Sequence, residues 1–341
     1  MFDFFYTRFV TFAAAMSSFE KTIIGNNIQE AAQWLTSGHC VAIPTETVYG
    51  LAANALDPAV VVQIFEVKNR PAFDPLIVHL PNIDHVARYT TEFPLPLRAL
   101  AERFWPGPLT ILLPKKEIIP DLVTSGLPRV ALRVPAHPLA HELLLHLPFP
   151  LAAPSANPFG YISPTTAQHV ADQLFGKIPY ILDGGPCSIG VESTIVGWEN
   201  GKIVVYRLGG MSIEDIENVA GSVEIMLNQS SNPAAPGMLK SHYAPRKPLY
   251  LNYLEENIER FKYQRIGLLT FQTYPETTIA AAQIALSPNG SLIEAAQHLF
   301  AALRALDNAD IDLILAETMP DQGLGKAIND RLRRAAAPEN D

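Results

Sequence analysis

Short apolar runs alternate along the chain with longer segments in which apolar residues recur at helical spacing. An apolar run over residues 40–43 leads into a Thr-Glu-Thr turn, and a helix is expected over 58–67. The sequence Lys-Asn-Arg-Pro at 68–71 follows that helix, and a second apolar run over 75–80 carries His79. This order places the Thr turn and the Lys-x-Arg pair at the ends of elements, where α/β proteins bind ligands. Two cations beside hydroxyls and a histidine suit an anionic, phosphate-bearing substrate.

The alternation continues to residue 221 and predicts one large domain over 18–221. Its expected helices cover 28–37, 95–104, 137–147, 163–175 and 212–221, and its further expected strands cover 109–113, 130–134, 150–153, 180–182, 193–196 and 203–208. The fourth of these helices is expected to be capped at Ser163, with Pro164 in its first turn. Because strands and helices mix without a strict βαβ rhythm, the pattern predicts an α/β fold with a twisted mixed sheet.

Composition and periodicity change after residue 221. Residues 222–248 contain four prolines and little periodicity, which indicates a linker or a functional loop. The segment 236–246 within it is too rich in His, Tyr, Lys and Arg for a passive tether. Residues 249–341 predict a small Rossmann-like α/β domain, with strands over 265–271, 278–286 and 311–316 and helices over 292–306 and 324–334.

The bulk composition is that of a packed globular protein, with 48% hydrophobic and 17% charged residues. The net charge of −9 argues against a protein that mainly coats nucleic acid, although a local basic pocket is compatible with it. The two cysteines, Cys40 and Cys187, form no CxxC pair. Their separation argues against a zinc site or a disulfide framework and fits a reduced, cytoplasmic setting.

The start of the chain is apolar and aromatic, but it lacks the basic beginning of a signal peptide. It is also too short and too interrupted to span a membrane, and no other window is long and apolar enough. We therefore expect no membrane association. Residues 1–17 are expected to be a dispensable extension, with Met16 as a plausible start. An organellar presequence is the weaker interpretation, because such presequences are rich in Arg and poor in acids.

Most single candidate residues also have an ordinary structural explanation. Lys68 and Arg70 suit a solvated helix end, and Ser155 with Asn157 suits a turn. Arg133 is harder to explain in this way, because a guanidinium inside an apolar strand needs an anion. No acidic residue neighbours it in the sequence.

Other patterns are less informative. Glu46 and Glu192 are candidate acid–base groups, but the sequence does not show that they meet. His137 and His141 lie one helical turn apart without an HExxH pattern, which argues against a metal site. The chain contains no Walker A sequence, so a nucleotide would have to be held in another way.

Several segments together carry a more specific signal: PTETVYGL, KNRP with PLIVHL, APSAN, SPT, ESTIV and YRLG. In order and spacing they resemble the YrdC-like domain of threonylcarbamoyl-AMP synthases. The segment SHYAP, followed by a small α/β unit, resembles the two-domain form of these enzymes. The resemblance covers nearly the whole chain after Met16. It implies a YrdC-like domain over 18–221, a linker that forms an active-site lid over 222–248, and a Rossmann-like domain over 249–341.

The resemblance also implies a reaction. A nucleotidyltransferase of this kind uses L-threonine, bicarbonate or CO2, and ATP to form threonylcarbamoyl-AMP and pyrophosphate. Mg2+ is expected to accompany ATP, without a metal site made of protein ligands. The product is expected to pass to a tRNA-modifying threonylcarbamoyl transferase complex that acts on adenosine 37 of tRNA, and a weak direct tRNA contact is compatible with this role. Catalysis would rest on positioning and on cations that face the phosphates.

Site residues are carried over by motif. The set expected to hold threonine, with Arg133 clamping the carboxylate, is Thr45, Thr47, His79, Arg133, Ala153 and Ser193. The set expected to hold ATP is Lys68, Arg70, Asp74, Arg129, Ser155, Asn157, Ser163, Arg207, His242 and Tyr243. Lys68 and Arg70 are the expected catalytic residues. His242 and Tyr243 are expected to close over the nucleotide and exclude water.

Two positions depart from the family pattern. Asp74 stands where Asn is usual, and its carboxylate would repel phosphate unless it faces Arg70 or the metal. Arg129 stands where a small hydroxyl residue is common. Our hypothesis is that this extra cation compensates the charge of Asp74.

Two rival functions remain compatible with the sequence. An RNA-binding module without catalysis would bind tRNA tightly and with strong salt dependence, and would not need threonine. A related enzyme acting on another carbamoyl substrate would not depend on threonine either. The ESTIV segment and Arg133 make the second rival the weaker one.

Overall fold

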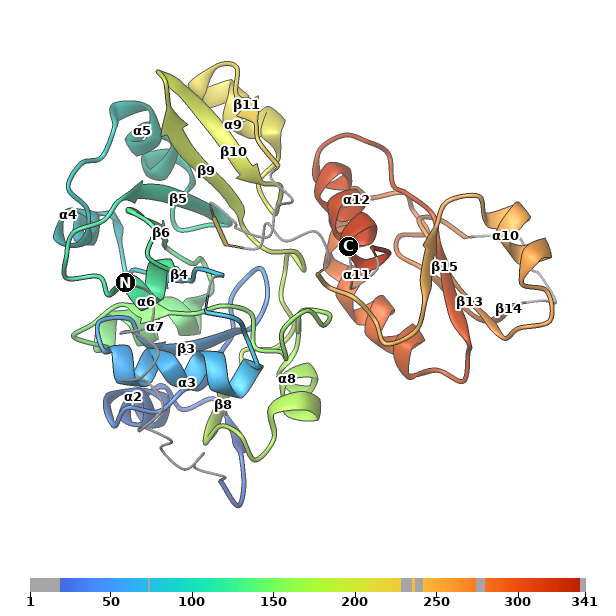
Figure 1. The fold of residues 1–341 in the computed structure, drawn as a ribbon, viewed down its shortest axis with the longest axis horizontal. Helices are drawn as coiled ribbons and strands as arrows, with labels where there is room; N and C mark the ends of the chain where they lie inside the picture. Colours follow the sequence, from blue (N-terminus) through green and yellow to red (C-terminus); the bar gives the residue numbers. More distant parts are fainter. Residues whose placement is uncertain (1–18, 73, 228–234, 237–241, 274–279, 338–341) are drawn as a thin grey trace, which may run out of the picture.

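The computed structural model describes residues 19–72, 74–227, 235–236, 242–273 and 280–337. The expected extension over 1–17 lies outside these residues, as do the parts 228–234 and 237–241 of the expected lid. The described chain forms a larger and a smaller α/β body that lie side by side (Figure 1). None of the helices within the described ranges is long and apolar enough to cross a membrane.

A sheet of 11 strands forms the centre of the larger body, in the order β1-β8-β2-β3-β7-β4-β6-β5-β9-β10-β11. The sheet contains parallel pairs, such as β4 with β6, and antiparallel pairs, such as β5 with β6, which confirms the expected mixed sheet. The strands are β1 (Ile23–Gly25), β2 (Val41–Ile43), β3 (Gly50–Asn54), β4 (Ile77–His79), β5 (Leu109–Pro114), β6 (Arg129–Arg133), β7 (Leu151–Ala152), β8 (Tyr180–Leu182), β9 (Thr194–Glu199), β10 (Lys202–Arg207) and β11 (Glu224–Ile225).

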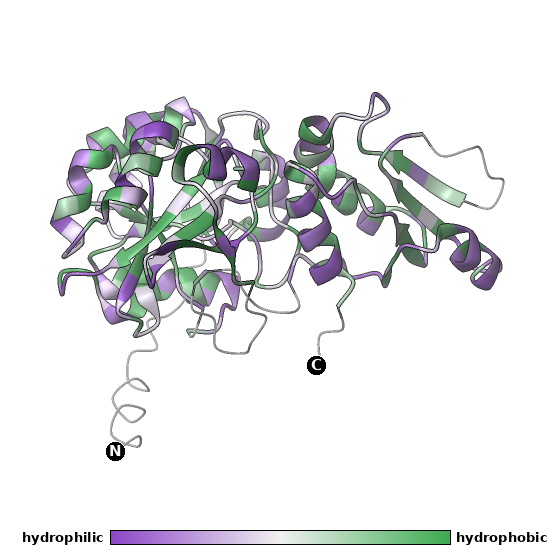
Figure 2. Ribbon diagram, turned by 90° about the horizontal axis from the view of Figure 1, so that it is seen from above, coloured by the Kyte–Doolittle hydropathy of each residue, from purple (hydrophilic) through white to green (hydrophobic). Residues whose placement is uncertain are grey.

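Helices cover this sheet, and their apolar residues pack onto strands that are largely hydrophobic (Figure 2). They are α2 (Ile28–Thr36), α3 (Pro58–Lys68), the 3-10 helix η1 (Ile83–His85), α4 (Val86–Tyr89), α5 (Leu95–Phe104), α6 (Asp121–Thr124), α7 (Pro138–His146), α8 (Ala167–Leu174) and α9 (Ile213–Ala220).

Helix α3 shows how local sequence rules place the Lys-x-Arg pair. Asp57 caps its start by accepting a hydrogen bond from the Ala59 backbone N–H at 2.9 Å, and Pro58 occupies the first turn. Asn69 ends the helix in the left-handed conformation, with φ of 51°. Lys68 therefore lies in the last helical turn, and Arg70 lies just beyond the end of the helix.

The hydrophobic pattern did not reveal strand β3, which follows the Thr-Glu-Thr turn. β3 pairs antiparallel with β2, with Val41 opposite Ala52, so the turn is the loop of a hairpin. The sequence Gly-Leu-Ala-Ala-Asn has no β-branched or aromatic residue and therefore little intrinsic strand preference. Small residues are needed there because a Cβ on Gly50 would lie only 3.2 Å from the Cβ of Ala153.

The expectation of a helix capped at Ser163 was wrong. Helix α8 begins at Ala167, and the Thr166 side chain caps it by accepting a hydrogen bond from the His169 N–H at 3.2 Å. Ser163 has a tertiary partner instead, since its Oγ donates to Oε1 of Glu192 at 2.6 Å. A hydroxyl held by a distant carboxylate does not cap the next helix.

The smaller body has a sheet of 4 strands in the order β12-β15-β13-β14, in which every pair is parallel. Its elements are β12 (Leu249–Leu251), α10 (Leu254–Arg260), β13 (Ile266–Thr270), β14 (Ala280–Ala285), α11 (Leu292–Asn308), β15 (Leu313–Ala316) and α12 (Leu324–Ala335). This confirms the Rossmann-like unit. The pattern missed β12, which is only three residues long, and α10, which buries only Leu254 and so has no apolar stripe.

Helices α11 and α12 lie on the side of the small sheet that faces the larger body (Figure 1). Val48, Ile162 and Val191 of the larger body share one hydrophobic cluster with Leu299 and Phe300 of α11. The two bodies therefore pack through a common apolar core and not through the linker alone.

A glycine marks the closest approach in this interface. Gly190 has φ of +82°, and a Cβ at this position would lie 2.4 Å from the Ala296 carbonyl oxygen and 2.5 Å from the Gln297 Cα. Both of those atoms belong to the backbone of α11, so they cannot move aside cheaply. Gly201 has a nearly identical φ of +81°, but nothing lies within 4 Å of a Cβ built there.

We expect Gly190→Ala to lower the free energy of unfolding by more than Gly201→Ala does. The backbone strain of a left-handed alanine costs about 1–2 kcal/mol at either position. Overpacking against α11 adds about 1–3 kcal/mol at Gly190 only. Urea unfolding of both variants measures the difference, and equal losses would show that α11 is not held in place by this contact.

Candidate active site

One cavity gathers most of the residues expected to bind ligands. Its lining includes members of both expected sets: Thr45, Thr47, Arg70, His79, Arg133, Ala153, Ser155, Ser193, Arg207, His242 and Tyr243. These residues come from distant parts of the chain. The structure therefore brings the threonine set and much of the ATP set to a single site, as the motif order implied.

The register of the central strands explains part of this convergence. β4 and β6 run parallel and pair His79 with Arg133, and each of these residues is the last of its strand. The antiparallel strand β7 begins beside them, with Leu151 opposite His79. The carboxyl ends of two parallel strands thus present an imidazole and a guanidinium at the same edge of the sheet.

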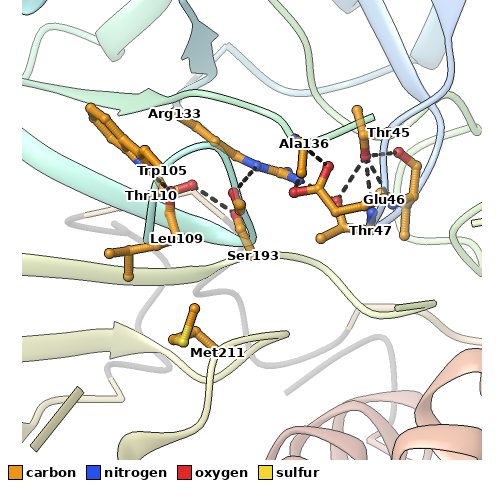
Figure 3. A network of polar contacts seen from close by, with 12 residues as sticks. Thr45, Glu46, Thr47, Trp105, Leu109, Thr110, Arg133, Ala136, Ser193 and Met211 are labelled. Carbon is orange, nitrogen blue, oxygen red and sulfur yellow. Dashed lines mark hydrogen bonds and ion pairs between the residues drawn. The ribbon is translucent and has the colours of Figure 1, made fainter. Parts of the chain in front are cut away.

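Arg133 finds its anion in the Thr-Glu-Thr loop (Figure 3). Its Nη2 lies 2.7 Å from Oε1 of Glu46, and its Nη1 donates to the Thr47 hydroxyl at 2.9 Å. Its Nε donates to the Gly107 carbonyl at 3.2 Å. Thr45 supports the loop, with its Oγ1 2.8 Å from the Thr47 hydroxyl. The charge of this buried arginine is therefore balanced by a glutamate that is distant in the sequence but adjacent in space.

Ser193 lies between two groups of the site. Its Oγ is 2.7 Å from the Thr110 hydroxyl, a pair also seen in Figure 3. On its other side, Arg207 Nη2 donates to the Ser193 carbonyl at 2.9 Å and to its hydroxyl at 3.1 Å. Burial lowers the pKa of Arg207 to about 10, so the guanidinium stays charged at neutral pH. Arg207 thus fixes Ser193 while keeping a positive charge at the cavity wall.

Two buried histidines of the cavity are neutral. Burial, with the Arg133 charge as a second cause, lowers the pKa of His79 to about 3. Burial and the neighbouring Arg70 and Lys68 lower the pKa of His242 well below its ordinary value. Both residues line the cavity. A neutral imidazole ring has one donor and one acceptor nitrogen, so both rings are suited to bind a polar ligand.

Lys68 is buried and does not line the cavity. Its ammonium donates to the backbone carbonyls of Ser155, at 2.6 Å, and Asn157. Burial and the nearby Arg70 lower the pKa of Lys68 well below its ordinary value. In this conformation Lys68 braces the Ser-x-Asn loop. The expected catalytic role of Lys68 remains a prediction.

The two departures from the family pattern have separate ion-pair partners. Asp74 Oδ2 lies 2.8 Å from Arg70 Nη2. The carboxylate therefore faces Arg70, one of the two partners that were expected to neutralise it. Arg129 Nη1 lies 2.9 Å from Oε1 of Glu199 and also donates to the Tyr206 hydroxyl at 2.9 Å. Asp74 thus has an ion pair with Arg70, and Arg129 has an ion pair with Glu199. The hypothesis that Arg129 compensates the charge of Asp74 stays a prediction.

Five residues of the expected ATP set lie outside the cavity lining in the part of the chain that the structure describes: Lys68, Asp74, Arg129, Asn157 and Ser163. Asn157 Nδ2 donates to the Tyr161 carbonyl at 2.8 Å, and Ser163 donates to Glu192. Glu192 itself does line the cavity. Asn157 and Ser163 therefore shape the wall of the cavity, whereas Arg129 is held at Glu199.

Comparison with known proteins gives two family matches along the chain. Residues 33–209 match the family described as "Telomere recombination", whose model is named Sua5_yciO_yrdC. Residues 211–337 match the family described as "Threonylcarbamoyl-AMP synthase, C-terminal domain". A threonylcarbamoyl-AMP synthase of Pyrococcus abyssi is 42% identical over 91% of this chain and 94% of its own length.

The chain belongs to the threonylcarbamoyl-AMP synthase family. A second relative with that name, from Bacillus subtilis, is 41% identical over 91% of this chain and 92% of its own length. The crystal structure of P. abyssi Sua5 complexed with L-threonine superposes with a TM-score of 0.86 and 41% identity, covering 92% of this chain and 98% of that one. These matches confirm the family and the two-domain fold expected from the motifs.

In this member of the synthase family, Glu46 and Glu192 were candidate acid–base groups whose partners the sequence did not reveal. The structure gives each a buried arginine, Arg133 for Glu46 and Arg331 for Glu192. Arg331 was not singled out, because it lies in an ordinary charged stretch of the last helix. The sequence placed Arg331 only within the expected helix over 324–334.

The lowered pKa of His79 predicts a pH dependence of stability. The unfolded chain binds this proton near the ordinary histidine pKa of about 6.5, whereas the folded chain binds it only near about 3. The stability that the neutral ring provides is complete above pH 6.5 and falls as the pH drops toward 3. We expect His79→Gln to reduce the slope of unfolding free energy against pH by about 1.4 kcal/mol per unit near pH 5.

Urea unfolding between pH 5 and 7 measures this slope. His146→Gln, at the exposed end of α7, is the matched control. An unchanged slope in the His79 variant would contradict the burial of a neutral imidazole at this site.

Proposed function

We propose that this protein catalyses the formation of threonylcarbamoyl-AMP and pyrophosphate from L-threonine, bicarbonate or CO2, and ATP, which makes it a nucleotidyltransferase. The observation that carries the proposal is the convergence of the two residue sets on one cavity, whose lining includes Arg133, Ser193 and Arg207. The names of the relatives, threonylcarbamoyl-AMP synthase, support the same reaction.

The threonine half of the site would centre on Arg133. Its guanidinium binds the Thr47 hydroxyl, pairs with Glu46 and lines the cavity, and the planar group is suited to bind a ligand carboxylate. The neutral His79 ring offers an acceptor to a substrate ammonium or hydroxyl group. Thr45, Ala153 and Ser193 complete this half. The P. abyssi relative has been solved with L-threonine bound, which supports the assignment.

The ATP half would use Arg70 and Arg207 as cations for the phosphates, with Ser155 at the same wall. Tyr243 and His242 come from the segment after residue 222 and close this side of the cavity. A solved variant of P. abyssi Sua5 in which a histidine and the following tyrosine are replaced by alanine superposes with a TM-score of 0.86. The present chain contains a single His-Tyr sequence, which is His242-Tyr243.

Magnesium would arrive with the nucleotide. In the described ranges no group of three or more His, Cys, Asp or Glu side chains is placed to hold a metal ion. The nearby carboxylates of Asp74 and Glu192 are engaged with Arg70 and Arg331. The residues therefore fit an ion bound mostly by phosphate oxygens and water, which Mg2+ favours.

Catalysis would then consist of alignment, charge stabilisation and exclusion of water. Arginines that already point into a buried cavity need little reorganisation when charge develops on the transferring phosphorus. A lid that carries His242 and Tyr243 would protect the labile adenylate from hydrolysis. We propose a cytoplasmic protein that passes this product to a tRNA-modifying transferase complex. Direct tRNA contact stays a prediction, and family membership favours the synthase over the RNA-binding rival.

Pyrophosphate release from ATP tests the proposal. We expect release to require both L-threonine and bicarbonate, and we expect Arg133→Ala to abolish it because the carboxylate clamp is lost. Arg98→Ala is the matched control, since Arg98 lies exposed on α5 and pairs only with Glu102 among the described residues. Mass spectrometry of the product distinguishes threonylcarbamoyl-AMP from simple ATP hydrolysis.

Other outcomes of this assay would overturn the proposal. Release that does not depend on threonine would point to another acceptor, as the rival carbamoyl enzyme predicts. No release in the presence of magnesium, together with tight and salt-sensitive tRNA binding, would favour the RNA-binding module.

A further inference from the structure

Arg331 of helix α12 is a fully buried arginine whose contacts lie mostly in the other body of the protein. Its Nε donates to Oε2 of Glu192 at 2.7 Å, and its Nη2 donates to the Leu208 carbonyl at 2.9 Å. Within its own helix, Nη1 donates to Asp330 at 2.6 Å. The guanidinium also lies 4.9 Å from the centre of the Tyr243 ring. One side chain of the C-terminal domain thus reaches three segments that border the cavity.

Two of those segments carry a residue expected to hold ATP, and the Glu192 segment carries Ser193, which is expected to hold threonine. Glu192 accepts the hydrogen bond from Ser163, and it immediately precedes Ser193. Leu208 directly follows Arg207, and Tyr243 is itself a lining residue. Arg331 lies outside the lining, so it touches the site only through these neighbours.

The charge of Glu192 gives this arrangement its importance. Burial disfavours the ionised carboxylate, but Arg331 and Arg207, with the hydrogen bonds of Ser163 and Arg331, hold the pKa of Glu192 below its ordinary value. Glu192 is therefore a carboxylate anion in the wall of a cavity proposed to bind a triphosphate. An anion in that place repels phosphate unless a cation neutralises it.

Arg331 supplies that cation and thereby leaves Arg207 available. Among the described residues, the hydrogen bonds of Arg207 go to the carbonyls of Ser193 and Pro236 and to the Ser193 hydroxyl, and none goes to a carboxylate. The other two arginines of the cavity, Arg70 and Arg133, each pair with an acid. Arg207 is thus the lining arginine without a carboxylate partner in the described chain.

We propose that Arg331 is a positioning residue through which the C-terminal domain completes the nucleotide half of the active site. It neutralises Glu192, keeps Arg207 free for phosphate and holds the Tyr243 ring against the cavity. This inference rests on the proposed function, because it concerns the ATP side of that reaction. It gives the C-terminal domain a role inside the site in addition to the attachment of the linker.

The same helix offers a control contact. Lys326 of α12 pairs with Glu214 of α9 at 2.7 Å, so this ion pair also joins the two bodies, but it is partly exposed and lies away from the cavity lining. A general loosening of the interface would affect both contacts. Loss of the Arg331 contacts alone would affect the nucleotide site.

Steady-state pyrophosphate release is measured with ATP and threonine varied separately. We expect Arg331→Met to raise the KM for ATP about tenfold, within the range typical of coupling between contacting groups, and to change the KM for threonine less than about twofold. Glu192→Gln added to Arg331→Met should recover most of the ATP affinity, because it removes the unpaired anion. Lys326→Met should leave both KM values unchanged.

Thermal unfolding of each variant accompanies the kinetics, because a buried arginine is costly to remove. If Arg331→Met does not fold, Arg331→Lys carries the same test. The lysine keeps the charge but lacks the branched guanidinium that binds Glu192 and Leu208 together. It should therefore raise the KM for ATP by less than Arg331→Met does.

Three results would overturn the inference: equal rises in both KM values, the same effect from Lys326→Met, or additive losses from Glu192→Gln and Arg331→Met. An unaltered protein that releases no pyrophosphate would overturn the proposed function itself, and this inference with it. An active unaltered enzyme whose Arg331 variants bind ATP normally would overturn the inference alone.

Discussion

Buried positive charge is the constraint on which this structure depends. Arg70, Arg133 and Arg207 line one cavity and are almost entirely shielded from bulk water. A buried guanidinium is costly unless an anion, a dipole or a ligand balances it. The fold meets this requirement with a different arrangement for each arginine, and those arrangements account for the positions of the loops around the site.

Arg133 shows how one ion pair organises the large sheet. It ends β6, and its partner Glu46 lies in the hairpin loop between β2 and β3. The second oxygen of Glu46 accepts a hydrogen bond from the Ala136 N–H at 3.1 Å, which ties this loop to the segment after β6. The Glu46 carbonyl also accepts from Ile189 at 2.8 Å, in the loop that packs against the C-terminal domain. The anion that balances the arginine therefore connects the centre of the sheet to the domain interface.

The C-terminal domain extends this logic across the interface. Its helix α11 presses on the loop that contains Gly190, and its helix α12 inserts Arg331 toward Glu192. Apolar packing stabilises this interface between the two bodies. The buried ion pair specifies its geometry, because any other orientation of the bodies would leave a buried charge unpaired. In this way a residue of the second domain contacts residues that border the cavity without lining the cavity itself.

The sequence by itself determined the parts of this protein that depend on local signals and on motif order. Apolar periodicity gave the helices α3, α5, α11 and α12, and short continuous apolar runs gave the strands β5, β6 and β13, which are buried along nearly their whole length. Motif order led to the family, and the comparisons agree. Strand β3 was not predicted because its residues have little strand preference, and the close approach of Ala153 to Gly50 became visible only in the structure.

Only the tertiary structure decided which charges meet. The hydroxyl of Ser163 was expected to cap a helix, but it binds Glu192, which lies 29 positions later in the chain. Arg133 and Glu46 are 87 residues apart in the chain, and Arg331 and Glu192 are 139 residues apart. Ion pairs between such distant residues leave no periodic trace in the sequence, because they depend on how the elements pack and not on the propensity of any one segment.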